Sequence, residues 1–270
     1  MTVNWDIGAA MVTDPGCHRP LNEDSGCIVQ PTEDAVRRER GVLVIVADGM
    51  GGHNAGEVAS KIAVETIRTK YYGQNGTPVD ETLHSSVEAA NTAIYEHARG
   101  NPEQSGMGTT CVALAICGDH ASVASVGDSR LYLVRAQGIY RMTVDDSAVG
   151  DLVRQGVISS EEAKKRDDRN VLTRALGTHE SVAIYKWDEP LPLREGDVFV
   201  LCSDGLTDLV SDEEILQHAS TAHPADAAKT LVELSKSRGG YDNITAAVVR
   251  LNAAKAERAA VKATRETPLR

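Results

Sequence analysis

Residues 41–52, GVLVIVADGMGG, carry the strongest structural pattern in the sequence. The run from Gly41 to Ala47 is apolar and rich in β-branched side chains, as is typical of a strand whose two faces are both buried. Asp48 follows this run directly, and glycines flank Met50 in the turn that comes next. The pattern predicts a central strand that ends on a carboxylate beside a tight turn.

The segments after this strand predict further helices and strands. Apolar residues at helical spacing indicate helices over 55–72 and about 80–99. The predicted strands, in chain order, cover 109–116, 121–126, 131–135, a segment near Ile139, 183–187, 198–202 and 244–251. Turn signals such as Gly127-Asp128 separate the first four of these strands, so we expect them to form a meander.

Two capping boxes and a charged segment complete this outline. Ser211 and Glu214 predict the start of one helix, and another is expected to begin near Pro224. The segment 145–170 is charged and contains the capping box Ser159-x-x-Glu162, so we expect an exposed insertion over the sheets. Strands and helices that occur in blocks favour antiparallel sheets over a βαβ repeat.

Length, composition and charge indicate which class of protein this is. The chain has 270 residues, of which 41% are hydrophobic and 25% charged, and no linker divides it, so we expect one globular domain. Its formal charge of -11 argues against binding to nucleic acid. The last 18 residues are rich in alanine and basic side chains and predict either a solvated, partly helical tail or a docking segment for an acidic partner.

Location and redox state are also predicted. No apolar run approaches the roughly 20 residues needed to cross a bilayer, and the N-terminus lacks the basic leader of a signal peptide, so we expect a cytoplasmic protein without membrane insertion. The five cysteines include no C-x-x-C pair, which indicates reduced thiols and neither a disulfide framework nor a zinc site.

Four aspartates lie next to predicted strand ends, three of them beside glycine: Asp48, Asp128, Asp204 and Asp242. Strand ends can meet at one edge of a sheet protein, and carboxylates gathered there repel one another unless cations neutralise them. An all-oxygen site favours Mg²⁺ or Mn²⁺ over Zn²⁺. The alternative is that each acid is only part of a turn, since Asp-Gly is a common turn dipeptide.

Other residues fit a site for a phosphate ester. Gly49, next to Asp48, allows backbone groups to approach an ion or phosphate closely. Arg19 could hold two phosphate oxygens in a fork, and Glu23 and Asp24 nearby could orient waters on the metals. Two ions about 4 Å apart would suit phosphoester hydrolysis. Taken alone, Arg19 is an ordinary surface charge.

Taken in order, these segments resemble a known family. The matching blocks are TDPG at 13–16 with Arg19, NED at 22–24, VADGMGGHNAGEVAS at 46–60, GTT at 108–110, VGDSRLYLVR at 126–135, NVLTRALG at 170–177, LCSDGLTDLV at 201–210 and DN at 242–243. They resemble the metal-dependent Ser/Thr protein phosphatases of type 2C in their compact bacterial form, from about Ile7 to Leu251.

The resemblance implies a fold and a division of the chain. The expected fold is of class α+β, a four-layer αββα sandwich of two antiparallel β-sheets flanked by helices, with the metal centre at one end. A phosphatase domain would cover 1–252, with a mobile flap at about 145–170, and the tail would cover 253–270. One departure is Asp145-Asp146-Ser147, where many bacterial members have Asp-His-Ser, so the behaviour of the flap is open.

The resemblance also implies a role for each candidate residue. Asp48 would bridge two core ions of Mg²⁺ or Mn²⁺, the Gly49 carbonyl would bind the second ion, and Asp204 and Asp242 would bind the first. Glu23 and Asp24 would hold waters on the metals, and Asp128 with Asp204 would bind a weaker third ion. Arg19 would hold the phosphate. His53 would be the general acid, or else an exposed histidine in a turn.

The leading hypothesis is a phosphatase that hydrolyses phosphoserine and phosphothreonine in proteins through a water activated by two metal ions. Its expected partners are phosphorylated proteins and a cognate Ser/Thr kinase, and the family favours a monomer. No nucleophilic cysteine is predicted, since Cys202 lacks a C-x5-R loop. Two alternatives remain: an inactive binding module of the same fold, or a phosphatase for a dedicated regulator or a small phosphoester.

Overall fold

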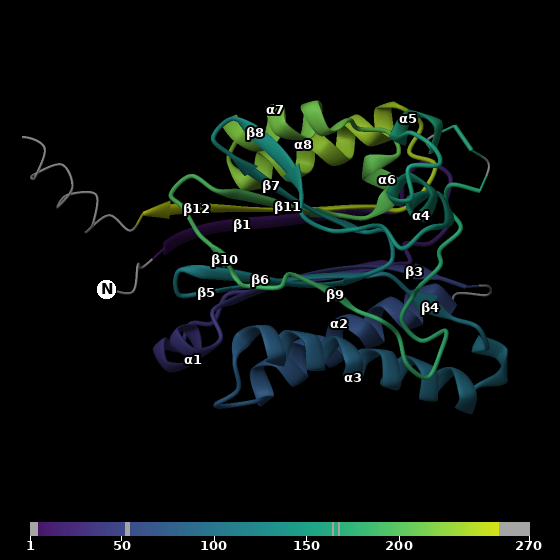
Figure 1. Ribbon diagram of the computed structural model, residues 1–270, viewed down its shortest axis with the longest axis horizontal. Coiled ribbons are helices and arrows are strands. Elements are labelled where there is room, and N and C mark those ends of the chain that lie inside the picture. Colours follow the sequence, from purple (N-terminus) through teal and green to yellow (C-terminus); the bar gives the residue numbers. More distant parts are fainter. Residues whose placement is uncertain (1–4, 52–54, 164, 167, 254–270) are drawn as a thin grey trace, which may run out of the picture.

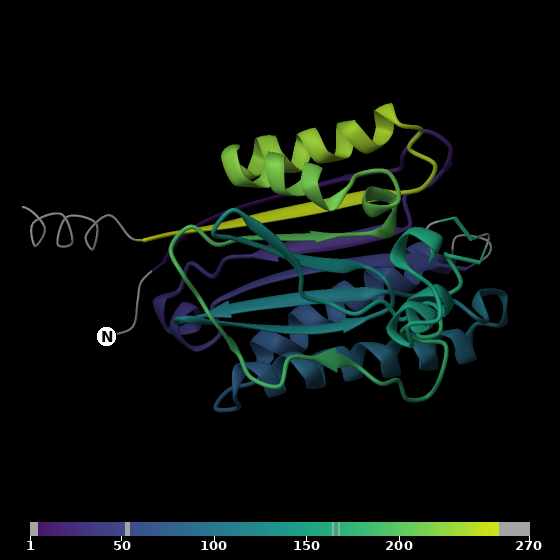
Figure 2. The ribbon, with the colours of Figure 1, turned by 45° about the horizontal axis from the view of Figure 1, so that its top comes forward.

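The structure is a computed structural model that describes residues 5–51, 55–163, 165, 166 and 168–253. Two sheets pack face to face, and a layer of helices covers the outer face of each sheet (Figure 1). The same order of layers is visible when the molecule is turned (Figure 2). All the strand pairs in the two sheets are antiparallel among the described residues. The predicted α+β sandwich is therefore confirmed.

The first sheet contains both ends of the described chain. Its strands, in spatial order, are β1 (Trp5–Asp14), β12 (Ile244–Ala253), β11 (Val198–Cys202), β7 (Arg130–Arg135) and β8 (Gly138–Arg141). The last strand of the sequence thus lies between the first strand and β11, and it pairs with β1 along ten residues.

The second sheet is built around the strand that carries Asp48. Its strands, in spatial order, are β10 (Leu191–Pro192), β6 (His120–Val126), β5 (Cys111–Cys117), β3 (Val42–Met50) and β2 (Asp24–Val29). Two short strands lie off this path: β4 (Gly108–Thr109) pairs with β3, and β9 (Tyr185–Lys186) pairs with β6.

Long amphipathic helices cover the two outer faces. The second sheet is covered by α2 (Ala55–Gly73) and α3 (Val79–Gly100), and the first by α7 (Asp212–Thr221) and α8 (Pro224–Ser237) (Figure 1). The short helices are α1 (Asp34–Glu39), a 3₁₀ turn (Pro102–Gln104), α4 (Ala148–Arg154), α5 (Ser160–Ala163) and α6 (Asp204–Thr207). The Ser211-Glu214 capping box predicted at α7 is present.

Alternate residues of β3 face two different cores. Leu43 and Ile45 pack in the core beneath α2 and α3, whereas Val42, Val44 and Val46 pack in the core between the sheets. Successive side chains of a strand point to opposite faces, so a strand between helices and a second sheet must be apolar on both. The continuous apolar run in the sequence has this cause, and the predicted central strand is confirmed.

The predicted meander is wrong. β5 and β6 lie in the second sheet, but β7 and β8 lie in the first, so the chain crosses between the sheets at Gly127. Both β6 and β7 are buried on their two faces, and each strand achieves this by lying in a different sheet with a helical layer outside it. Gly127 has a φ of 95°, and a Cβ there would lie 2.7 Å from the side chain of Thr110, so the crossing requires glycine.

Other predictions need smaller corrections. The strand expected over 183–187 is reduced to the two residues of β9, and the sequence patterns did not predict β1, β2 or α1. The segment 145–170 is not wholly exposed, because Asp145, Asp146 and Ser147 at its start are buried. Their polar groups are satisfied there: Arg130 donates to Asp145, the Gly127 N–H donates to Asp146, and Ser147 caps α4.

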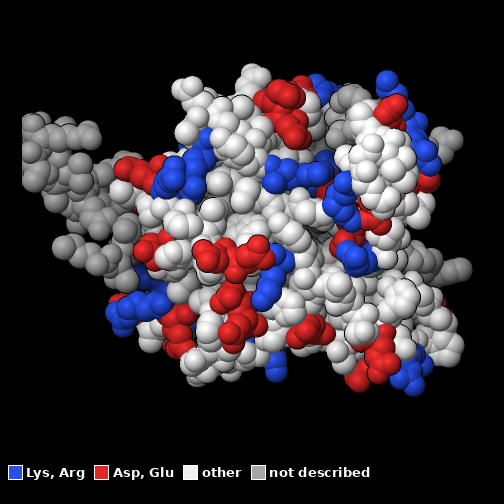
Figure 3. All heavy atoms as spheres, in the orientation of Figure 1, with Lys and Arg blue, Asp and Glu red and all other residues white. Residues whose placement is uncertain are grey.

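Other observations concern the cysteines, the helices, the surface charges and the tail. All five cysteines are free thiols, as expected. None of the described helices is long and apolar enough to cross a membrane. Acidic and basic side chains are interspersed on the face drawn in Figure 3. The tail from 254 to 270 lies outside the described residues.

Candidate metal centre

Strand pairing brings the predicted acids to one end of the sandwich. Asp24 of β2 lies opposite Asp48 of β3 in the second sheet. Asp204 comes just after β11 and Asp242 just before β12, and these two strands are antiparallel neighbours in the first sheet. Asp128 lies where the chain crosses between the sheets. The prediction that Asp48, Asp128, Asp204 and Asp242 converge is therefore confirmed.

Asp48 lies at the centre of this group. Its side chain is close enough to Asp204 to share a hydrogen bond. Burial raises the pKa of Asp48 well above its ordinary value, and the negative charges of Asp24, Asp204, Asp128 and Asp242 raise it further. The pKa of Asp204 rises to about 6, mainly through burial and then through neighbouring acids. The folded chain thus holds several carboxylates where their negative charges oppose one another.

Hydroxyl groups fix the backbone of Asp48. The Asp48 N–H donates to Thr110 Oγ1 at 2.9 Å, and the Thr109 hydroxyl donates to the Asp48 carbonyl at 2.8 Å. Thr110 Oγ1 in turn lies 2.7 Å from Ser129 Oγ, next to Asp128. The Gly-Thr-Thr block of the sequence therefore holds the carboxylate-bearing strand end in place.

Asp24 joins the two sheets. One of its oxygens, Oδ2, accepts hydrogen bonds from Ser203 at 2.8 Å and Thr245 at 2.6 Å. Ser203 directly follows β11 and Thr245 lies in β12, so both belong to the first sheet's side of the sandwich. Its other oxygen, Oδ1, is buried and has no hydrogen-bond partner among the described residues. Burial raises the pKa of Asp24 to about 7, although these two hydroxyl donors lower it.

Asp128 is held by the start of the 145–170 segment. Asp146 Oδ2 accepts a hydrogen bond from the Gly127 N–H at 3.2 Å, and the Asp146 N–H donates to the Gly127 carbonyl at 2.9 Å. Arg174 pairs with the other oxygen of Asp146 at 2.5 Å. Burial and the charges of Asp204 and Asp145 raise the pKa of Asp128 well above its ordinary value. The unusual Asp146 thus anchors the turn that carries Asp128.

Gly49 and Gly56 allow the end of β3 to touch the start of α2. A Cβ on Gly49 would lie 2.1 Å from the Gly56 carbonyl oxygen, which leaves no room for a side chain. The backbone N–H groups of Gly56 and Glu57 act to lower the pKa of the Glu23 carboxyl. Burial nevertheless raises the pKa of Glu23, with the positive charge of Arg19 acting in the opposite direction.

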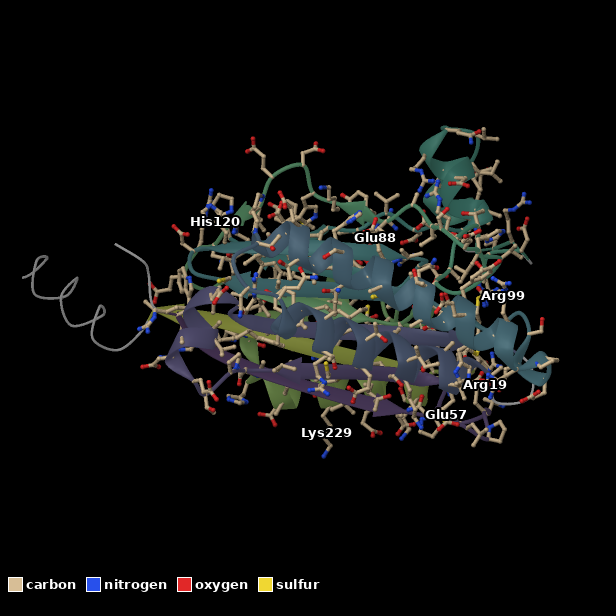
Figure 4. All side chains as sticks on the ribbon, turned by 90° about the horizontal axis from the view of Figure 1, so that it is seen from below. Arg19, Glu57, Glu88, Arg99, His120 and Lys229 are labelled. Carbon is tan, nitrogen blue, oxygen red and sulfur yellow. The ribbon has the colours of Figure 1, made fainter. Side chains whose placement is uncertain are left out.

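Arg19 supplies the positive charge at this end. Its Nη2 pairs with Asp242 Oδ2 at 2.7 Å, and about half of the side chain, 51%, is exposed. Glu23 and Asp48 also raise its pKa, which shows that all three acids lie near the guanidinium. Figure 4 labels Arg19 and Glu57 at one end of the molecule and His120 at the other.

The residues present fit a hard divalent cation. Asp204 Oδ1, like Asp24 Oδ1, is buried without a hydrogen-bond partner among the described residues, so both oxygens can accept a cation. In the described part of the chain, no group of three or more His, Cys, Asp and Glu side chains forms a ready metal-binding cluster. Mg²⁺ is commonly held by one or two carboxylates with water completing its shell, which matches this arrangement.

A cavity of about 520 Å³ gives access beside the acids. It lies between β7, α4 and the start of α7, and Asp128 and Asp204 form part of its wall. Arg130, which is paired with Asp145 at 2.8 Å, lines it as well. Of the candidate residues, His53 lies outside the described residues.

Known proteins are similar to this chain in sequence and in fold. The model of the family described as Protein phosphatase 2C matches residues 29–237. This chain belongs to that family. The predicted resemblance is confirmed.

Two curated relatives and one solved structure illustrate the similarity to other phosphatase 2C proteins. Serine/threonine protein phosphatase PstP of Mycobacterium tuberculosis is 38% identical over 225 residues, which cover 83% of this chain but only 43% of PstP. Serine/threonine phosphatase stp of Listeria innocua is 35% identical over 89% of this chain and 94% of its own length. The catalytic domain of PstP with two manganese ions is similar with a TM-score of 0.78 and 35% identity, over 92% of this chain and all of that one.

Several residues at the site were missed by sequence reasoning. Ser203, Thr245 and Asn243 hold the acids or their loops, yet none belongs to a charged or metal-ligating type. Ser203 and Asn243 each adjoin a candidate acid and lie in blocks that match the family, and these are signals that could have drawn attention to them. Arg174 lies in the NVLTRALG block, but its pairing with Asp146 depends on contact between distant loops.

Proposed function

We propose that this chain is a metal-dependent phosphatase that hydrolyses phosphoserine and phosphothreonine in proteins. The observation that supports this most directly is a group of buried, mutually repelling carboxylates beside the half-exposed guanidinium of Arg19. The carboxylates favour divalent cations, and the guanidinium favours a phosphate. A site that attracts both is suited to hydrolysis of a phosphate ester.

The family resemblance supplies the ion-binding roles. Asp48, Asp204 and Asp242, with the Gly49 carbonyl, would hold two core ions of Mg²⁺ or Mn²⁺, and Asp128 with Asp204 would hold a weaker third. Glu23 and Asp24 would orient water in the centre. When bound, the ions would supply a hydroxide-like nucleophile from water and neutralise charge on the phosphoryl group.

The chain's own groups bind and orient the substrate. Arg19 would present its free N–H groups to the phosphate oxygens while Asp242 holds the guanidinium plane. His53 would donate a proton to the leaving serine or threonine oxygen, a task suited to a histidine near neutral pH. The substrate would be a phosphorylated protein, and a Ser/Thr kinase would be the opposing enzyme. The reaction would take place in the cytoplasm.

The decisive assay measures phosphate release from a phosphothreonine peptide and from p-nitrophenyl phosphate by the purified chain. We expect release in Mn²⁺ or Mg²⁺ and none in EDTA. If folded, metal-loaded protein releases no phosphate from either substrate, the phosphatase proposal is wrong and an inactive binding module becomes the better interpretation. Release from the small ester alone would instead indicate a phosphatase for small phosphoesters.

Arg19→Ala should reduce kcat/KM for the peptide by about 10- to 100-fold, because a charge-assisted hydrogen bond contributes roughly 1.5–3 kcal/mol. Arg19→Lys should restore only part of the rate, since a lysine keeps the charge but not the fork. Steady-state kinetics in Mn²⁺ check both variants, with Arg37→Ala, an exposed arginine on α1, as the control. Unchanged kinetics for Arg19→Ala would show that the guanidinium does not bind the substrate.

A further inference from the structure

Two aromatic rings stack on the surface beside Arg19. The rings of His18 and Tyr241 have centroids 5.2 Å apart and planes that differ by 27°. Both residues are exposed, and 63% of Tyr241 is accessible to solvent. The chain has only seven tyrosines, two tryptophans and one phenylalanine, so an exposed stacked pair is an unusual use of an aromatic residue here.

The pair is built into the two loops that hold the candidate phosphate site. His18 precedes Arg19, and Tyr241 precedes Asp242, the residue to which Arg19 is paired at 2.7 Å. Neighbouring Cα atoms are about 3.8 Å apart, so the backbone that carries the two rings adjoins the backbone that carries this ion pair. The stack is therefore carried by the rim of the candidate phosphate site.

Backbone contacts make this rim rigid. The Cys17 N–H donates to the Gly240 carbonyl at 2.8 Å, and Asn243 Nδ2 donates to the Pro15 carbonyl at 3.0 Å. A Cβ on Gly16 would lie 2.2 Å from the Asp242 carbonyl oxygen, so the loops touch at a position that only glycine allows. A rigid platform loses little conformational entropy when a ligand packs on it.

We propose that the His18–Tyr241 pair is a substrate-positioning platform, which stacks against an aromatic or proline side chain one or two residues from the phosphorylated residue. This inference rests on the proposed phosphatase function. Exposed aromatic faces attract flat apolar groups, and such a contact near the anchored phosphate would fix the direction of the peptide.

The alternative is that the stack only braces the two loops. If the stack only holds the two loops in position, it affects Arg19 and Asp242, and so removing a ring would slow the hydrolysis of every substrate. If the stack is a platform, removing a ring would slow only substrates that have a flat residue next to the phosphorylated one. The test therefore compares three substrates in Mn²⁺: N-acetyl phosphothreonine amide, a phosphothreonine peptide flanked by alanines, and the same peptide with phenylalanine at each flanking position in turn.

Tyr241→Ala and His18→Ala should each lower kcat/KM for the best phenylalanine peptide by about 3- to 10-fold, mainly through KM. Both variants should change the rates on the other two substrates by less than about twofold, and Tyr241→Phe should retain the preference. Tyr140→Ala on β8, where the tyrosine is 54% exposed, is the matched control and should have no effect.

Two results would overturn the platform. Equal losses on all three substrates would mean that the stack braces the loops, and an unchanged phenylalanine preference in Tyr241→Ala and His18→Ala would mean that the rings do not touch the peptide. If the wild-type protein hydrolyses none of the substrates, the proposed phosphatase function itself is wrong. This outcome differs from the two results above, because both of them require an active wild-type protein.

Discussion

Replacing Asp204 by alanine is expected to reduce phosphatase activity on the order of a thousandfold or more. Its buried Oδ1 has no protein partner among the described residues, and its carboxyl lies within hydrogen-bonding reach of Asp48, so the substitution removes an oxygen from the centre of the acid group. Loss of a metal ligand removes several kcal/mol of transition-state stabilisation, and each 1.36 kcal/mol corresponds to a tenfold change in rate.

The measurement is phosphate release from a phosphothreonine peptide in saturating Mn²⁺, with thermal unfolding recorded on the same samples. Asp188→Ala provides the matched control, because Asp188 is an exposed aspartate in the loop between β9 and β10. The metal-free Asp204→Ala protein should unfold at a temperature no lower than that of the metal-free wild type, since one of several opposing charges is gone. Full activity in this variant would contradict the proposed centre.

The metal-free protein should lose stability as the pH rises from about 4 to about 7. Folding raises the pKa of Asp24 from 3.8 to about 7 and that of Asp204 to about 6. Between the unfolded and folded values the native state binds more protons than the unfolded state, so the free energy of unfolding falls with increasing pH. The loss should be on the order of a few kcal/mol, because one pKa unit corresponds to 1.36 kcal/mol.

Urea unfolding in EDTA at pH 5 and pH 7.5 measures this loss. Asp24→Asn should make the pH dependence shallower, because the amide does not titrate. Adding Mn²⁺ or Mg²⁺ at pH 7.5 should restore stability by about 2.7 kcal/mol when the free ion reaches 100 times its Kd. A metal-free protein that becomes more stable between pH 5 and pH 7.5, or a variant with an unchanged slope, would contradict this account of the acids.

Individual strands and helices could be predicted from local patterns because those patterns have local causes, whereas the layered sandwich was expected from the family resemblance. The apolar run of β3 reflects burial on two faces, and the Ser211-Glu214 box reflects the unpaired N–H groups at the start of α7. The crossing at Gly127 could not be predicted in this way. A Gly-Asp turn looks the same in sequence whether the next strand pairs with the previous one or enters another sheet.

The candidate site likewise contains residues that could be predicted from the sequence and residues that could not. Asp48, Asp204 and Asp242 could be found because acids beside strand ends are visible in sequence, and the family resemblance assigned roles to them. The bonds from Ser203 and Thr245 to Asp24 could not be found, because they depend on how the two sheets face each other. Neutral hydroxyl residues carry no pattern that distinguishes such a position from any other buried serine or threonine.

The position of β12 between β1 and β11 has a consequence for synthesis on the ribosome. Both the first sheet and the acid group stay incomplete until residues 242–253, which contain Asp242 and β12, have left the exit tunnel. A nascent chain stopped before that point would leave β1 without its strand partner and Asp24 without the Thr245 hydroxyl. Catalytic competence should therefore require β12, and no N-terminal fragment that lacks β12 should show partial activity.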